Sequence, residues 1–142
     1  MPQHKETRIL PFRPEQLFDL VADIERYPEF LPWCKGARIL KREGKTITAD
    51  LIIGYKMFRE KFTSIVTLER PRAISVAYQS GPLAHLKNEW DFLPAKDGCV
   101  LSFHVDFDFH SKLLGATMGL FFDKALSRMA AAFEERAREL YG

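Results

Sequence analysis

The stretch Cys99-Val-Leu-Ser-Phe-His-Val-Asp-Phe-Asp-Phe109 decides the fold, because an apolar residue occupies every second position along it. This period of two predicts a strand with one dry face and one wet face. The same period recurs in segments 46–55, 58–68 and 85–92, and Ile74, Val76 and Tyr78 also share a face. Together these segments predict an antiparallel sheet between residues 36 and 109.

The segments on either side of this sheet predict one further strand and two helices. Residues 3–10 predict a first strand, and Pro14 occupies the first turn of a helix, where proline is favoured. Residues 112–140 have helical periodicity, and a helix of that length is roughly 43 Å long. It is the element long enough to cover the dry face of the sheet.

The predicted fold class is therefore α+β, a helix-grip fold. A curved antiparallel sheet wraps around a long C-terminal helix and leaves an apolar cavity between them. No linker or repeat interrupts the chain, so we expect a single domain over residues 1–142.

Composition narrows the classes of function. The net charge of +2 argues against a DNA-binding protein dominated by phosphate contacts. The two cysteines form no Cys-x-x-Cys motif, and His85 and His104 fall on wet faces, so we expect no metal site. The longest near-apolar stretch, Leu113–Phe122, is far shorter than the roughly 20 residues of a membrane span. We expect a cytoplasmic protein, in contact with a membrane at most peripherally.

Polar residues interrupt the dry strand faces at Glu60, Ser64 and Asn88, and Tyr55 and Tyr78 also face inward. A buried polar group without a partner costs about 1–3 kcal/mol, and an unpaired carboxylate costs more. Two interpretations remain open. The residues form an internal hydrogen-bond network, or they supply polar contacts in a mostly apolar ligand pocket.

Two further apolar segments lie outside the sheet. The stretch Tyr27-Pro-Glu-Phe-Leu-Pro-Trp-Cys34 carries two prolines and four bulky apolar residues, which is typical of a loop that folds back onto the core. Residues Leu113–Phe122 are apolar nearly all round the helix, so we expect this segment to form the entrance or a membrane-facing lip.

The chain resembles the coenzyme Q-binding START-domain family, within the wider polyketide-cyclase and lipid-transport superfamily. The resemblance covers roughly residues 3–142 and rests on residues 23–34, 58–68, 105–109, 121–123 and 132–137 together with Leu86, Asn88, Trp90 and Phe92. It implies a START-like helix-grip fold, ubiquinone as bound ligand, and support of respiration or quinone biosynthesis without catalysis. It also implies peripheral contact with the inner membrane or a respiratory complex. Bacterial members are also labelled ribosome-association toxins.

We expect donors such as Asn88 and the tyrosine hydroxyls to approach the quinone oxygens, and the last helix to lie along the isoprenoid tail. The candidate ligand-binding residues are Tyr27, Phe30, Trp33, Tyr55, Glu60, Phe62, Ser64, Tyr78, Asn88, Trp90, Phe103, Leu114, Met118, Phe121, Phe122 and Met129. No catalytic residue and no catalytic cofactor are predicted.

Two other functions remain open. A ribosome-associating protein that blocks subunit association would use surface cations between Lys35 and Lys45 together with Lys56, Arg59 and Lys61. An enzyme resembling a polyketide cyclase or hydratase would use a buried Glu60 as general acid or base.

Overall fold

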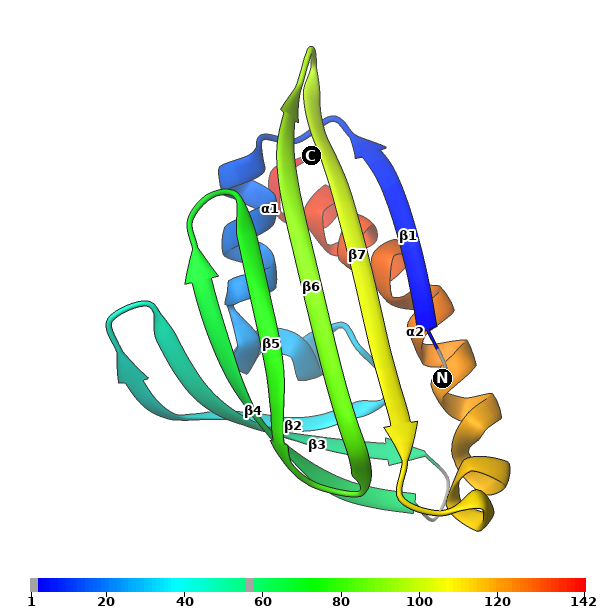
Figure 1. The fold of residues 1–142 in the computed structure, drawn as a ribbon. Coiled ribbons are helices and arrows are strands. Elements are labelled where there is room, and N and C mark those ends of the chain that lie inside the picture. The colour runs from blue at the N-terminus through cyan, green and yellow to red at the C-terminus, as the bar shows by residue number, and fades with distance from the viewer. Residues whose placement is uncertain (1–2, 56–57) are drawn as a thin grey trace.

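The computed structural model describes residues 3–55 and 58–142, without the side chains of residues 55, 58, 114 and 117. In this part the chain forms seven strands, two α-helices and one 3-10 helix (Figure 1). Their bounds are β1 (Gln3–Leu10), α1 (Pro14–Ala22), η1 (Ile24–Glu29), β2 (Cys34–Glu43), β3 (Thr46–Tyr55), β4 (Phe58–Glu69), β5 (Ala73–Ser80), β6 (Leu83–Ala95), β7 (Gly98–Phe109) and α2 (Lys112–Tyr141).

The strands form one antiparallel sheet in the order β1-β7-β6-β5-β4-β3-β2. Strands β2 to β7 pair with their neighbours in sequence. The first strand, β1, pairs with the last strand, β7. The predicted period of two is confirmed in β7, where Leu101, Phe103 and Val105 are all buried. Across the sheet, Trp90 of β6 lies opposite Phe103 of β7 and Ile74 of β5, so their side chains share the inner face.

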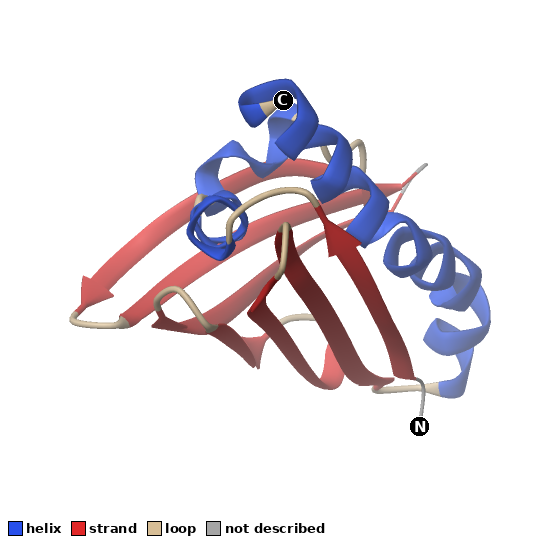
Figure 2. Cartoon of the chain, turned by 90° about the horizontal axis from the view of Figure 1, so that it is seen from above, coloured by secondary structure: helices blue, strands red, loops and turns tan. Residues whose placement is uncertain are grey.

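Both α-helices lie on the same side of the curved sheet, and α2 crosses it from end to end (Figures 1 and 2). The helix directs Met118, Phe122 and Phe133 toward the sheet, and all three are buried. The predicted helix-grip arrangement is therefore confirmed. Among the residues that the structure describes, those that are fully buried are all apolar.

The segment between α1 and β2 folds back onto this core, as its composition predicted. Leu31 and Cys34 are buried, and Tyr27, Phe30 and Trp33 pack against the core with their side chains half-buried. The hydroxyl of Tyr27 donates to the backbone carbonyl of Val21, which ties η1 to the end of α1. Burial raises the pKa of the Tyr27 hydroxyl, so it remains a neutral donor.

Candidate ligand-binding site

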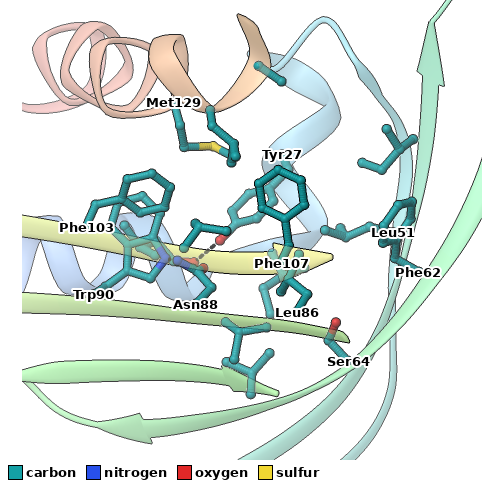
Figure 3. A pocket seen from close by; sticks show the side chains of 18 of the residues that line it. Tyr27, Leu51, Phe62, Ser64, Leu86, Asn88, Trp90, Phe103, Phe107 and Met129 are labelled. Atoms are coloured by element: carbon teal, nitrogen blue, oxygen red, sulfur yellow. Dashed lines mark hydrogen bonds between the residues drawn. The ribbon is translucent and has the colours of Figure 1, made fainter. Parts of the chain in front are cut away.

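A cavity of about 160 Å³ lies between the inner face of the sheet and the helices. Figure 3 shows Met129 pointing into it from α2, with Asn88, Trp90 and Phe103 at one end. Ten of the predicted ligand-binding residues line it: Tyr27, Trp33, Phe62, Ser64, Asn88, Trp90, Phe103, Phe121, Phe122 and Met129. The tertiary structure thus brings together residues from η1, the following loop, β4, β6, β7 and α2.

Aromatic rings form one end of this cavity, with Phe133 of α2 at their centre. The Phe133 ring meets Tyr27 and Trp90 nearly edge-on, at centroid distances of 5.4 and 5.1 Å. The Trp90 ring also lies 4.6 Å from that of Phe103. Such edge-to-face pairs contribute about 0.5–1.5 kcal/mol each beyond the area they bury. This end of the cavity is therefore a rigid aromatic wall.

Asn88 is the polar residue within this aromatic end. Its Oδ1 atom accepts a hydrogen bond of 2.9 Å from the indole N–H of Trp90. Its Nδ2 atom donates a bond of 3.0 Å to the backbone carbonyl of His104. An amide nitrogen carries two hydrogens, and the His104 carbonyl takes one of them. Asn88 is thus held by the protein itself, as the network interpretation predicted, and its partners are Trp90 and His104.

Ser64 and Phe62 of β4 lie at the other end of the cavity, near Leu51 of β3 (Figure 3). Ser64 lies opposite Ala49 on one side and Tyr78 on the other in the sheet register. It supplies a hydroxyl to an otherwise apolar part of the wall.

The predicted burial of Glu60 is wrong, because this side chain is exposed and does not line the cavity. The register places Glu60 beside Ile53, which does line the cavity, so alternation assigned the correct side of the sheet. Alternation does not reveal where a sheet is covered, however. Glu60 lies near the start of β4, where the covering elements no longer exclude water.

Three other predicted residues lie outside the cavity wall. Phe30 packs edge-to-face against the Phe133 ring, at a centroid distance of 5.1 Å. The Tyr78 ring packs on Phe62, and its hydroxyl accepts a bond of 2.8 Å from the backbone N–H of Leu83. Met118 is buried in α2 without lining the cavity.

The predictions for Tyr55 and Leu114 concern side chains outside the described residues.

The sequence prediction missed much of the apolar wall, which consists of Val21, Ile24, Ala49, Leu51, Ile53, Val66, Ile74, Val76, Leu86, Val105, Phe107, Ala125, Leu126 and Phe133. Most of these residues were recognisable as inward-facing from the strand alternation. Their pattern could not separate residues that face a cavity from residues that pack directly against a helix.

The chemistry of this wall is that of a binding site for an apolar molecule. In the described part of the wall, Tyr27 is the one residue with a titratable side chain. No group of three or more metal-ligating side chains occurs among the described residues. Within those same residues, no helix has the length and apolar character needed to span a membrane.

Comparison with known proteins agrees with this geometry. Residues 10–134 match the family described as polyketide cyclase / dehydrase and lipid transport. The chain belongs to this family. Its fold matches that of a START superfamily protein from Mycobacterium smegmatis, with a TM-score of 0.83 at 20% identity over 97% of this chain and 98% of the other.

Two curated relatives carry different names. The ribosome association toxin RatA of Rickettsia prowazekii is 38% identical over 99% of both chains. The mitochondrial coenzyme Q-binding protein COQ10 homolog B of Xenopus laevis is 33% identical over 99% of this chain and 59% of its own length. The names of these members denote a toxin and a binding protein.

Proposed function

We propose that the protein binds a prenylated quinone, ubiquinone or a close relative, and carries it without catalysing a reaction on it. The observation that carries this proposal is the apolar, aromatic cavity with a single carboxamide, Asn88, at its aromatic end. Pockets for small apolar molecules have this composition. The name of the relative COQ10 homolog B, coenzyme Q-binding protein, supports the same ligand class.

The size of the cavity fits the ring of such a ligand rather than the whole molecule. An apolar cavity of about 150 Å³ holds a benzene-sized ring, whereas larger ligands occupy about 300–1,000 Å³. The volume here is about 160 Å³. The quinone ring would therefore stack among Trp90, Phe103 and Phe133, with the second Nδ2 hydrogen of Asn88 directed to a ring oxygen. The isoprenoid tail would leave the cavity.

The test is to extract lipids from the purified protein, identify them by mass spectrometry, and titrate the protein with a short-chain ubiquinone. Trp33 and Trp90 line the cavity, so a bound quinone should quench their fluorescence in a saturable way. The variant A49L places a larger side chain in the cavity wall and should weaken binding at least ten-fold.

The matched control is A77L, which makes the same change at an exposed position of β5 and should bind like the unmodified protein. Failure to recover any quinone or prenyl lipid, together with no saturable quenching, would refute the proposal. Equal affinities of A49L and the unmodified protein would place the ligand elsewhere.

A second candidate function is association with ribosomal subunits, which the name of the relative RatA supports. Of the cations that the sequence suggested for this role, Lys35 and Arg59 line a common surface groove, whereas Lys56 lies outside the described residues. Sedimentation with ribosomal subunits at low and moderate salt tests this function, since binding driven by phosphate contacts weakens steeply with salt.

The catalytic alternative required a buried Glu60 as general acid or base, and this carboxylate is exposed. A Glu60→Gln variant that binds quinone like the unmodified protein would agree with a carrier role.

A further inference from the structure

A second depression, an open groove of about 810 Å³, lies beside the cavity on the outer surface. Four of the residues that line it are cations, Lys35 of β2, Arg59 of β4, and Lys124 and Arg128 of α2. The lining contains one carboxylate, Glu135. Since the net charge of the whole chain is +2, this groove concentrates positive charge that the rest of the surface largely balances.

These four cations are not neutralised within the described part of the protein. None of the four has a described carboxylate within 4.0 Å, whereas Arg8, Arg26, Arg70 and Arg136 all form ion pairs. The ammonium group of Lys35 donates instead to the backbone carbonyl of Pro32, 2.8 Å away. The groove therefore offers its charge to an external anion.

The groove adjoins the cavity directly. Trp33, Phe121 and Ala125 line both, so these three residues form the partition between them. The proposed quinone tail must leave the cavity, and the groove is the depression that shares these residues with it. We therefore take the groove as the mouth of the proposed quinone site.

Exposed leucines extend the mouth along α2. Leu113 and Leu120 are 79% and 77% exposed, far more than is usual for leucine. They are seven residues apart, two helical turns, so they project from the same side of α2, and Lys124 follows one turn later. This combination of protruding apolar side chains and neighbouring cations is characteristic of a helix that lies in the interface of an anionic membrane.

We propose that the groove cations and the exposed leucines of α2 form one docking surface for an anionic phospholipid bilayer. Lys35, Arg59, Lys124 and Arg128 contact lipid phosphates, and the two leucines enter the interface. The mouth of the cavity then faces the hydrocarbon region from which a prenyl tail enters. This inference rests on the proposed function for its purpose, but the docking itself can be measured without quinone.

The charge complementarity alone would also suit an RNA backbone. Phosphate recognition in RNA gives no role to two leucines that are more than three-quarters exposed, whereas a bilayer interface does. The bilayer is therefore the occupant that accounts for both halves of the surface.

The experiment is co-sedimentation of the full chain with vesicles of phosphatidylcholine alone or with about one-third phosphatidylglycerol. The unmodified protein should bind the anionic vesicles and release them as salt is raised. Each lysine or arginine near an anionic surface contributes about five-fold to partitioning. The variant K35Q/R59Q/K124Q/R128Q should therefore partition roughly 600-fold more weakly.

The matched control, K5Q/R42Q/R72Q/K96Q, removes four exposed cations outside the groove, so it has the same net charge as the groove variant. It should retain most of the binding. The second variant, L113Q/L120Q, should weaken binding about ten-fold per leucine, whereas L40Q/L93Q, which alters two leucines on β2 and β6, should not.

The proposal would be overturned if the groove variant and its control bound anionic vesicles equally weakly. It would also be overturned if the unmodified protein did not bind these vesicles. Loss of ribosome sedimentation by the groove variant, with vesicle binding unchanged, would assign the groove to RNA and also overturn it. None of the four substituted cations lines the cavity, so the groove variant should still bind in solution a ubiquinone whose tail is too short to reach the groove. Failure of quinone binding with intact vesicle docking would refute the proposed function and leave the docking surface standing.

Discussion

Replacing Asn88 with alanine removes both side-chain hydrogen bonds at the aromatic end of the cavity. The indole N–H of Trp90, a residue that is only 3% exposed, then loses its acceptor. A buried donor left unpaired costs about 1–3 kcal/mol, and the lost bond to the His104 carbonyl adds about 1 kcal/mol. We therefore expect N88A to lower the free energy of unfolding by about 2–4 kcal/mol.

The assay is urea denaturation followed by far-UV circular dichroism, because the substitution changes the surroundings of a fluorescent tryptophan. A double-mutant cycle with W90F isolates the bond, since phenylalanine has no indole N–H. In the W90F background, N88A should cost about 1–3 kcal/mol less than in the unmodified protein. Gln79→Ala, which truncates an exposed amide on β5, should change stability by less than about 0.5 kcal/mol.

A loss from N88A within about 0.5 kcal/mol of zero, or no coupling to W90F, would refute this reasoning. Asn88 would then have no structural role, and its amide would be fully available to a ligand. The cycle thus decides how much of the Asn88 side chain serves the fold.

Three further outcomes follow from burial and charge. Phe133 is 1% exposed within the aromatic wall, so F133A should lower the free energy of unfolding by about 3–5 kcal/mol in the same urea assay, and a loss below about 1 kcal/mol would contradict its central position. Burial raises the pKa of the Cys34 and Cys99 thiols to about 11, leaving about 0.1% thiolate at pH 8. Alkylation by iodoacetamide should be far slower in the folded protein than in guanidinium chloride, and equal rates would contradict it. Hydrogen bonds from Arg138 and Arg8 lower the pKa of Glu134, so E134Q should cost up to about 1 kcal/mol at pH 7. That cost should begin to fall once the pH drops below the ordinary glutamate value of about 4.3 and should be lost through the lowered folded pKa. A cost as large at pH 3 as at pH 7 would contradict the ion pairs.

The strand faces and the long helix were predictable from the sequence because side-chain direction in these elements follows a fixed local period. Leu101, Phe103 and Val105 are buried wherever their strand packs, since every second side chain points to the same face. Asn88 was recognisable for the same reason, as a polar residue on a dry face. The loop containing Trp33 was predicted to fold inward from its apolar composition.

Three features were decided only by the tertiary structure: which part of the sheet the helices cover, which side chains form hydrogen bonds with each other, and which cations lie together on the surface. Glu60 lies on the predicted side of β4 but beyond the covered part, which no period encodes. The partner of Asn88 proved to be Trp90, although the two were predicted only to face the same way. Lys35 and Arg128 are far apart in sequence, and they line one groove because the sheet curves until β2 and β4 lie beside α2. Local periodicity specifies which way a side chain points, whereas the folding of the whole sheet around the helix determines what it meets.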